Sequence, residues 1–280
     1  MEPKIPGLFR GLSPEHQVLA RRMVEFMARA DQKYFARAAE LNGTAAHPRA
    51  EDTLSRETDD SIYDVRVTRG PVVEKLGRLL AEGKKTQPGR IEGVLVWGRF
   101  YSIDVHPQTP LVGMLHATLV LQFYEDGTAF AGGWLGVMNG TRVDEDMQAL
   151  TRVVDSHFAE YDRQPGLYRK LIVKGTKDTV TEFRRRPDPS GVSFYGPPVF
   201  PGDVARSYAL IEGLFGKFTD AYLDLVRKRV GSAVTVDDER LQDAMRKRWL
   251  VDQLFSDPFA SKLVPFEVWS LANVPPTVTF

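Results

Sequence analysis

The residues from Met114 to Tyr124 constrain the fold most, because apolar side chains occupy every second position of this stretch. Such strict alternation is typical of a β-strand that packs one face against a core. The opposite face is half polar and would suit the wall of a cavity; it carries His116, Thr118, Val120, Gln122 and Tyr124. The turn signal Glu125-Asp126-Gly127-Thr128 then predicts a hairpin into a strand over Ala129–Val137. With a further strand predicted over Gly93–Val105, we expect an antiparallel sheet in the middle of the chain.

Four long amphipathic segments surround this block of strands. Their apolar residues repeat with the period of an α-helix, over Pro14–Leu41, Asp144–Tyr161, Asp203–Arg229 and Asp237–Leu254. Ser13 is placed to cap the first of these helices, and Asn42-Gly43 is placed to end it. Helices before and after a run of consecutive strands are typical of the α+β class. We therefore expect a single domain over residues 1–280, with a large central antiparallel sheet flanked by helices on both faces.

Other segments carry weaker patterns. The sequence predicts a loop over Thr44–Thr58, a short helix over Val72–Leu80, short strands over Leu167–Lys174 and Val192–Tyr195, and an edge strand within Val264–Phe280. These assignments complete the expected order of elements along the chain.

Composition and charge exclude several classes of function. Lys and Arg together number 37, as do Asp and Glu, so the net charge is zero, and the broad positive surface of a nucleic-acid-binding protein is not expected. The chain has no cysteine, which excludes disulfides, thiolate catalysis and iron–sulfur clusters. No apolar run approaches the roughly 20 residues that span a bilayer, and the N-terminus lacks the apolar core of a signal peptide. We expect a cytoplasmic protein with no membrane or nucleic-acid partner.

The segment Ser102–His116 is the strongest candidate for chemistry, because it holds two of the five histidines. Imidazole has an unperturbed pKa of about 6.5, so it can give or take a proton near neutral pH. Asp104 precedes His106 by two residues, and a pleated strand points both side chains the same way, so the carboxylate can orient that imidazole. We take His116, His106 and Asp104 as candidate catalytic residues. The alternative is that His106 is a loop histidine and His116 a histidine on a half-buried strand.

A metal, a phosphate or a flat ligand would each need further residues. Two histidines on adjacent strands could supply two metal ligands, but no carboxylate cluster or third histidine is nearby in the sequence, so whether a metal binds stays open. The glycines of Ala131–Gly140 lack the spacing of a phosphate-binding loop. Trp134, within that run, would suit the wall of a pocket for a flat conjugated ligand.

Several segments, taken in order, resemble the oxygen-dependent coproporphyrinogen III oxidase family. The family pattern S-x-x-x-H-P-x-x-P-x-x-x-x-x-H is present with every spacing kept, at Ser102, His106, Pro107, Pro110 and His116. Further strings resemble family segments in the same order: G-P-V-V-E-K-L-G, A-G-G-W-L-G, L-Y-R-K-L-I-V-K, G-V-S-F-Y, A-Y-L-D-L-V-R-K-R and N-V-P-P. The resemblance covers about residues 15 to 280.

The resemblance implies a homodimer built on a large antiparallel sheet flanked by helices. It also implies oxidative decarboxylation of propionate side chains to vinyl groups, with O₂ as co-substrate and no required cofactor. By motif, Ser102 would touch the substrate, His106 would be a pocket histidine and His116 the proton donor. Further substrate contacts are expected at Thr118, Val120, Trp134 and Asn139.

The departures from the family pattern concern the substrate. Val120 stands where the family has a propionate-binding Arg, and Gly136 or Asn139 stands where it has an Asp that handles pyrrole N–H groups. A tetracarboxylate needs several Arg or Lys clamps. The sequence therefore predicts O₂-dependent oxidation of a small electron-rich molecule, pyrrole-like or aromatic, other than coproporphyrinogen. Two alternatives stay open: a non-oxidative decarboxylase, isomerase or cyclase that uses the same histidines, and a binding protein that has lost catalysis.

Overall fold

The structure of the chain, a computed structural model, describes residues 9, 11–44, 52–86, 93–171, 173–174, 184–185, 188–255 and 264–278. Its centre is a seven-stranded antiparallel sheet with the strand order β1-β2-β3-β4-β5-β6-β9. The strands are β1 (Asp52–Glu57), β2 (Ser61–Thr68), β3 (Val73–Gly83), β4 (Leu95–Pro107), β5 (Met114–Tyr124), β6 (Ala129–Met138) and β9 (Val192–Ser193). A separate two-stranded ribbon joins β7 (Val173–Lys174) to β8 (Arg184–Arg185). Because the first six strands pair in chain order, each is joined to the next by a direct connection.

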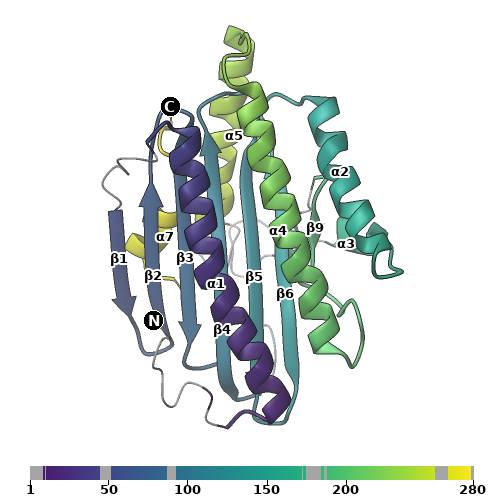
Figure 1. Cartoon of the computed structure of the whole chain (residues 1–280). Helices are drawn as coiled ribbons and strands as arrows, with labels where there is room; N and C mark the ends of the chain where they lie inside the picture. The colour runs from purple at the N-terminus through teal and green to yellow at the C-terminus, as the bar shows by residue number, and fades with distance from the viewer. Residues whose placement is uncertain are drawn as a thin grey trace.

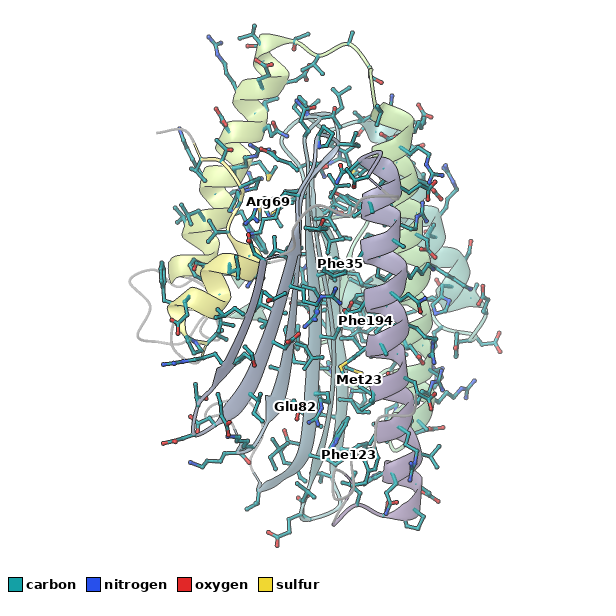
Figure 2. All side chains as sticks on the ribbon, turned by 60° about the vertical axis from the view of Figure 1, so that its left-hand side comes forward. Met23, Phe35, Arg69, Glu82, Phe123 and Phe194 are labelled. Carbon is teal, nitrogen blue, oxygen red and sulfur yellow. The ribbon has the colours of Figure 1, made fainter. Side chains whose placement is uncertain are left out.

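Helices cover both faces of this sheet (Figures 1 and 2). The front face, as we call it, lies under α1 (Pro14–Leu41) and α4 (Val204–Arg229), with α2 (Asp144–Ala159) packed beside α4. The short helix α3 (Gly166–Lys170) lies next to β9. The back face lies under α5 (Val236–Phe255) and α7 (Phe266–Asn273). The predicted α+β class, with one antiparallel sheet between layers of helices, is confirmed.

The two faces are built differently. The front face packs the alternate apolar residues of β4, β5 and β6 against α1 and α4 in one large core; from β5 these are Leu115, Ala117, Leu119, Leu121 and Phe123. The back face has two small apolar clusters at separate places. One joins β2 and β3 to α7 and contains Tyr63, Val65, Val67, Leu79, Val268 and Ala272, and the other joins Met114 of β5 to Met245 and Trp249 of α5. The polar side chains of β3, β4 and β5 that face the back lie between these two clusters.

Local signals explain the helix ends. The Ser13 hydroxyl accepts a hydrogen bond from the backbone N–H of His16 at 3.2 Å, and Pro14 occupies the first turn of α1. Gly43 follows the helix with a φ of +65°, a conformation that glycine adopts without strain. At the start of α4, the Asp203 side chain accepts from the backbone N–H of Arg206 at 2.8 Å. The predicted helix Pro14–Leu41 and strand Met114–Tyr124 are confirmed at both ends, and the other long helices and strands of the prediction are confirmed with small shifts at their ends.

Four predictions of secondary structure were wrong. The segment Val72–Leu80 forms most of strand β3, not a helix, because a central strand buried on both faces shows no clean alternation of apolar and polar residues. The predicted loop Thr44–Thr58 contains strand β1, and its residues 45–51 lie outside the described residues. Within Leu167–Lys174 the first part is helix α3, and the predicted edge strand at the C-terminus is instead helix α7. Strand β2 was not predicted at all.

Within the described ranges, no helix combines the length and the apolar character needed to cross a bilayer.

Candidate functional site

The candidate residues of β4 and β5 lie on the back face because the strand register places them there. Asp104 pairs directly with His116, and Ser102 pairs with Thr118, which in turn pairs with Trp134 of β6. Side chains at directly paired positions of an antiparallel ladder have Cβ atoms about 5 Å apart. The register therefore brings most of the residues predicted from the sequence onto one surface.

Asp104 and His116 form a hydrogen-bonded pair at the centre of this surface. The Nδ1 of His116 contacts the Oδ1 of Asp104, so with an acceptor-only carboxylate the Nδ1–H donates. The carboxylate is fully buried, whereas the imidazole is 13 % exposed. A proton held on Nδ1 leaves Nε2 to accept a proton from a bound molecule, or to donate one when the ring is charged. The pair thus has the arrangement of an acid/base group with its orienting carboxylate.

The sequence predicted a different partner for this carboxylate. Asp104 was expected to orient His106, two residues away on the same strand, but its oxygen bonds to His116 on the neighbouring strand. The reason is distance: residues i and i+2 of a strand are almost 7 Å apart, whereas a directly opposite residue is about 5 Å away. The expectation that Asp104 serves His106 was wrong.

Trp249 of α5 covers the imidazole of His116. The two ring centroids are 5.1 Å apart with their planes tilted by 55°. The indole Nε1–H of Trp249 donates to the backbone carbonyl of Asn273 at 2.9 Å, which ties α5 to the end of α7. Helix α5 is also held at the end of β4, where the Gln242 amide donates to the carbonyl of Pro107 at 3.2 Å. The position of the aromatic cover over His116 is therefore fixed from two sides.

His106 lies beside this pair but is sealed from solvent. The residue is 1 % exposed, and neither ring nitrogen has a hydrogen-bond partner of good geometry among the described residues. Burial lowers the pKa of His106 well below its usual value, and the positive charges of Lys75 and Arg246 lower it further, partly offset by the backbone of Asn273. His106 is therefore a neutral, buried imidazole at physiological pH. The catalytic part predicted for it stays a prediction.

Lys75 is a member of this group that the sequence analysis missed. It pairs with His106 across β3 and β4, is 3 % exposed, and its Nζ donates to the carbonyl of Val274 at 2.6 Å. Burial lowers the pKa of Lys75 to about 8, with the charge of Asp104 acting in the opposite direction. The signal that could have found it is the string V-V-E-K-L-G, which places a lysine inside an apolar run. It was assigned to a helix, so the lysine was not placed on the sheet.

Arg246 brings a further charge from α5. Its Nη2 pairs with Glu74, which occupies an irregular position between Val73 and Lys75 of β3. The Arg246 side chain is 8 % exposed. The back face thus collects Lys75, Asp104, His106, His116 and Arg246 in one place. No group of three metal-ligating side chains converges anywhere in the part of the chain that the structure describes.

The predicted substrate-contact residues divide into two groups. Ser102, Thr118, Val120 and Trp134 all lie on the back face and are at most 6 % exposed. The Thr118 hydroxyl shares a hydrogen bond of 3.0 Å with the Tyr195 hydroxyl. Asn139 does not join them, because its amide contacts the sulfur of Met147 on α2, which belongs to the front-face core. The structure therefore brings together four of these five residues and separates Asn139 from them.

No model of a known protein family matches this chain. The kinship with the coproporphyrinogen oxidase family accordingly stays a prediction from the motifs.

Proposed function

We propose that this protein is an enzyme that oxidises a small electron-rich molecule, pyrrole-like or aromatic, with O₂, and that His116 transfers the proton. The observation that carries the proposal is the bond between the fully buried carboxylate of Asp104 and Nδ1 of His116. A carboxylate in this position fixes the tautomer and the orientation of the imidazole. Proton transfer by such a group contributes about 10²–10⁴-fold to a rate.

We propose an oxidation because the motifs resemble those of an oxidase family, and because the overall reaction consumes one proton that a histidine can supply. In oxidative decarboxylation of a propionate, R–CH₂–CH₂–COO⁻ + O₂ + H⁺ gives R–CH=CH₂ + CO₂ + H₂O₂. The bond to the carboxylate breaks, its electron pair forms the alkene, and the two electrons of the β C–H bond reduce O₂. One proton is consumed, and protonated His116 can supply it through Nε2. O₂ is the only oxidant that the proposal needs.

The side chains near the pair favour a flat substrate with few charges. Val120 and Trp134 are buried apolar side chains of the same face, and Val120 replaces one of the basic residues that a tetracarboxylate would need. Trp249 lies over His116 and is fully buried there, so the imidazole has apolar aromatic surroundings. These features support a substrate smaller or less acidic than a tetracarboxylate porphyrinogen.

A second candidate function follows from the same pair. A histidine held by an aspartate moves protons rather than electrons, so it would also serve a non-oxidative decarboxylase, isomerase or cyclase.

The homodimer implied by the resemblance also stays a prediction, which the mass of the protein in solution tests.

Oxygen consumption separates these functions. Electron-rich pyrroles and phenols that carry a propionate are supplied one at a time, with O₂ uptake, H₂O₂ and CO₂ measured, and the incubations are repeated without air. We expect uptake of one O₂ per CO₂, and a fall of about 10²–10⁴-fold in His116→Gln. Turnover that continues without air would assign the non-oxidative function.

Two variants serve as controls for this experiment. Asp104→Asn keeps the shape of the side chain and removes its charge, so turnover falls while the melting temperature stays within a few degrees. His157→Gln alters a buried histidine that bonds to the Leu210 carbonyl at 2.8 Å, remote from the pair, and should leave turnover unchanged. A His116→Gln protein that turns over at the full rate would remove the proposed function.

A further inference from the structure

A pocket opens on the back face next to the charged group, between the sheet and the chain that follows α7. Its volume is about 260 Å³, and its lining residues are Arg69, Lys75, Ser270, Leu271, Val274, Pro275 and Pro276. Figure 2 shows Arg69 at the end of β2, on the side of the sheet that α5 and α7 cover. The proposed function does not use this pocket.

The lining has two cations and no acidic residue. Lys75 is 3 % exposed and therefore forms the inner wall, whereas the Arg69 side chain is 44 % exposed and lies at the mouth. Asp52 of β1 pairs with Nη1 of Arg69 from outside the lining, which orients the guanidinium. Positive charge at two depths of one pocket favours an anion that enters with its charged end inward.

Lys75 is costly for the protein to keep. A buried ammonium needs hydrogen bonds and a counter-charge, and the bond that its Nζ makes to the Val274 carbonyl uses one of its three donors. The charges of Asp104 and Asp52 favour the protonated amine, and the charge of Arg69 opposes it. An anion in the pocket would add to this counter-charge and could accept from the remaining donors of Lys75.

Of the other five lining residues, four are apolar and one, Ser270, is polar. Leu271, Val274, Pro275 and Pro276 offer hydrocarbon surface, and the two prolines have little freedom to lose on binding. A ligand that fits both parts has one carboxylate and a small apolar body. A phosphate has no apolar body, and a volume of about 260 Å³ is too small for a large amphiphile.

We propose that this pocket binds a small monocarboxylic acid, with its carboxylate on Lys75 and Arg69 and its apolar body against Leu271, Val274 and the two prolines. Neither Asp104 nor His116 lines this pocket, and the carbonyl of Ala272 lies directly against Gly77, the residue opposite Asp104 on β3. The proposal does not depend on the proposed reaction.

Direct binding to the full chain tests the proposal without any turnover. Titration calorimetry and ligand-observed NMR are carried out with benzoate and indole-3-acetate, with benzamide as the uncharged partner of benzoate and inorganic phosphate as an anion without an apolar body. We expect the two carboxylates to bind in one saturable step and benzamide and phosphate to bind at least about tenfold more weakly, since a charge-assisted hydrogen bond contributes enough for that factor.

Variants then locate the site. Lys75→Met and, independently, Arg69→Gln should each weaken benzoate binding about tenfold or more. Arg56→Gln is the matched control, because Arg56 is an exposed arginine of the neighbouring strand that pairs with Glu267 at 3.4 Å outside the pocket, and it should leave the affinity unchanged. No binding of either carboxylate at millimolar concentration, equal binding of phosphate, or full affinity in Arg69→Gln would each overturn the proposal. Arg69 is exposed, so its variant tests the site even if Lys75→Met fails to fold.

Discussion

The two faces of the sheet use the same strands for opposite purposes. On the front face, Leu115, Ala117, Leu119 and their neighbours on β4 and β6 form one continuous apolar core with α1 and α4. One residue further along each strand, the back face carries Asp104, His106 and His116 between two small apolar clusters. The period of two in a β-strand thus separates stabilising residues from candidate catalytic residues that are sequence neighbours.

The two faces also differ in how their buried charged groups are paired. The front face also holds a buried guanidinium, but Arg78 contacts Asp31 at 3.0 Å and also pairs with Asp64, and the Tyr101 hydroxyl donates to Asp31 at 2.9 Å. On the back face His106 has no good partner among the described residues, and burial lowers the pKa of Lys75 to about 8. Buried groups of this kind are costly to stability, and they cluster at functional sites. From this comparison we predict that the front face contributes most of the stability and that the back face carries the proposed chemistry.

The largest effect that tests this division is expected for two neighbouring residues of β5. Leu119→Ala should lower the free energy of unfolding by about 3 kcal/mol, because it leaves a cavity in the front-face core. Thr118→Val, one position away, should lower it by about 1 kcal/mol or less, since it loses only the hydrogen bond with Tyr195. Urea unfolding at neutral pH measures both values. Equal losses in the two variants would contradict the division.

A smaller effect, of opposite sign, is expected at Lys75. The fall in its pKa from 10.5 to about 8 corresponds to a cost of about 3 kcal/mol for keeping the amine charged in the folded protein at pH 7. Lys75→Met removes that cost and loses the hydrogen bond to Val274, worth about 1 kcal/mol, so the variant should be more stable by about 2 kcal/mol.

The direction of the pKa shift of Lys75 also determines how the stability gain of Lys75→Met depends on pH. Between pH 8 and 10.5 the unfolded chain binds more protons at Lys75 than the folded chain, so the stability of the parent protein rises with pH in this window. The advantage of Lys75→Met should therefore shrink from pH 8 to pH 10. Urea unfolding at pH 7, 8.5 and 9.5 measures the trend, and a Lys75→Met protein that is less stable than the parent at pH 7 would show that the charge is well compensated.

The smallest effect concerns acid stability and His106. Its folded pKa lies well below the value of about 6.5 for an unfolded chain, so below pH 6.5 the unfolded state gains a proton that the folded state does not. Stability from this residue is present above pH 6.5 and is lost at up to about 1.4 kcal/mol per pH unit below it. His106→Leu should lose stability less steeply between pH 6.5 and 5. The two slopes come from urea unfolding at half-unit steps, and identical slopes would place the ring in contact with water.

The sequence predicted most of the fold wherever one period dominated. The alternation over Met114–Tyr124 and the capped stripe of Pro14–Leu41 gave elements with the right ends, because each has one face in the core and one face towards polar surroundings. Strand β3 was mistaken for a helix because Leu76 and Leu79 face opposite cores while Arg78 is buried by its acidic partners. Strand β1 was missed because it is an exposed edge without an apolar pattern.

The sequence predicted which face of a strand each site residue occupies, but not which residues meet across strands. Period-two reasoning placed Asp104, His106 and His116 on one surface, which is where they lie. It could not show that Asp104 bonds to His116, because that depends on the register between β4 and β5, which the Pro-containing connection sets. Trp249 was out of reach for a similar reason, since α5 meets the pair only through tertiary packing. Lys75 was missed because its segment was assigned to a helix and not to the strand that pairs with β4.

The order of the elements along the chain has a consequence for biosynthesis. The sheet strands β1 to β6 and helix α1 leave the ribosome early, whereas the cover of the back face, α5 and α7, is made last. Domains form from their N-terminal side during synthesis at about 5–20 residues per second, so a nascent chain exposes the histidine surface and the apolar strand residues of the back face for some seconds before the final helices arrive. This interval is when the polypeptide is most open to chaperones, to proteases and to wrong association through its uncovered sheet.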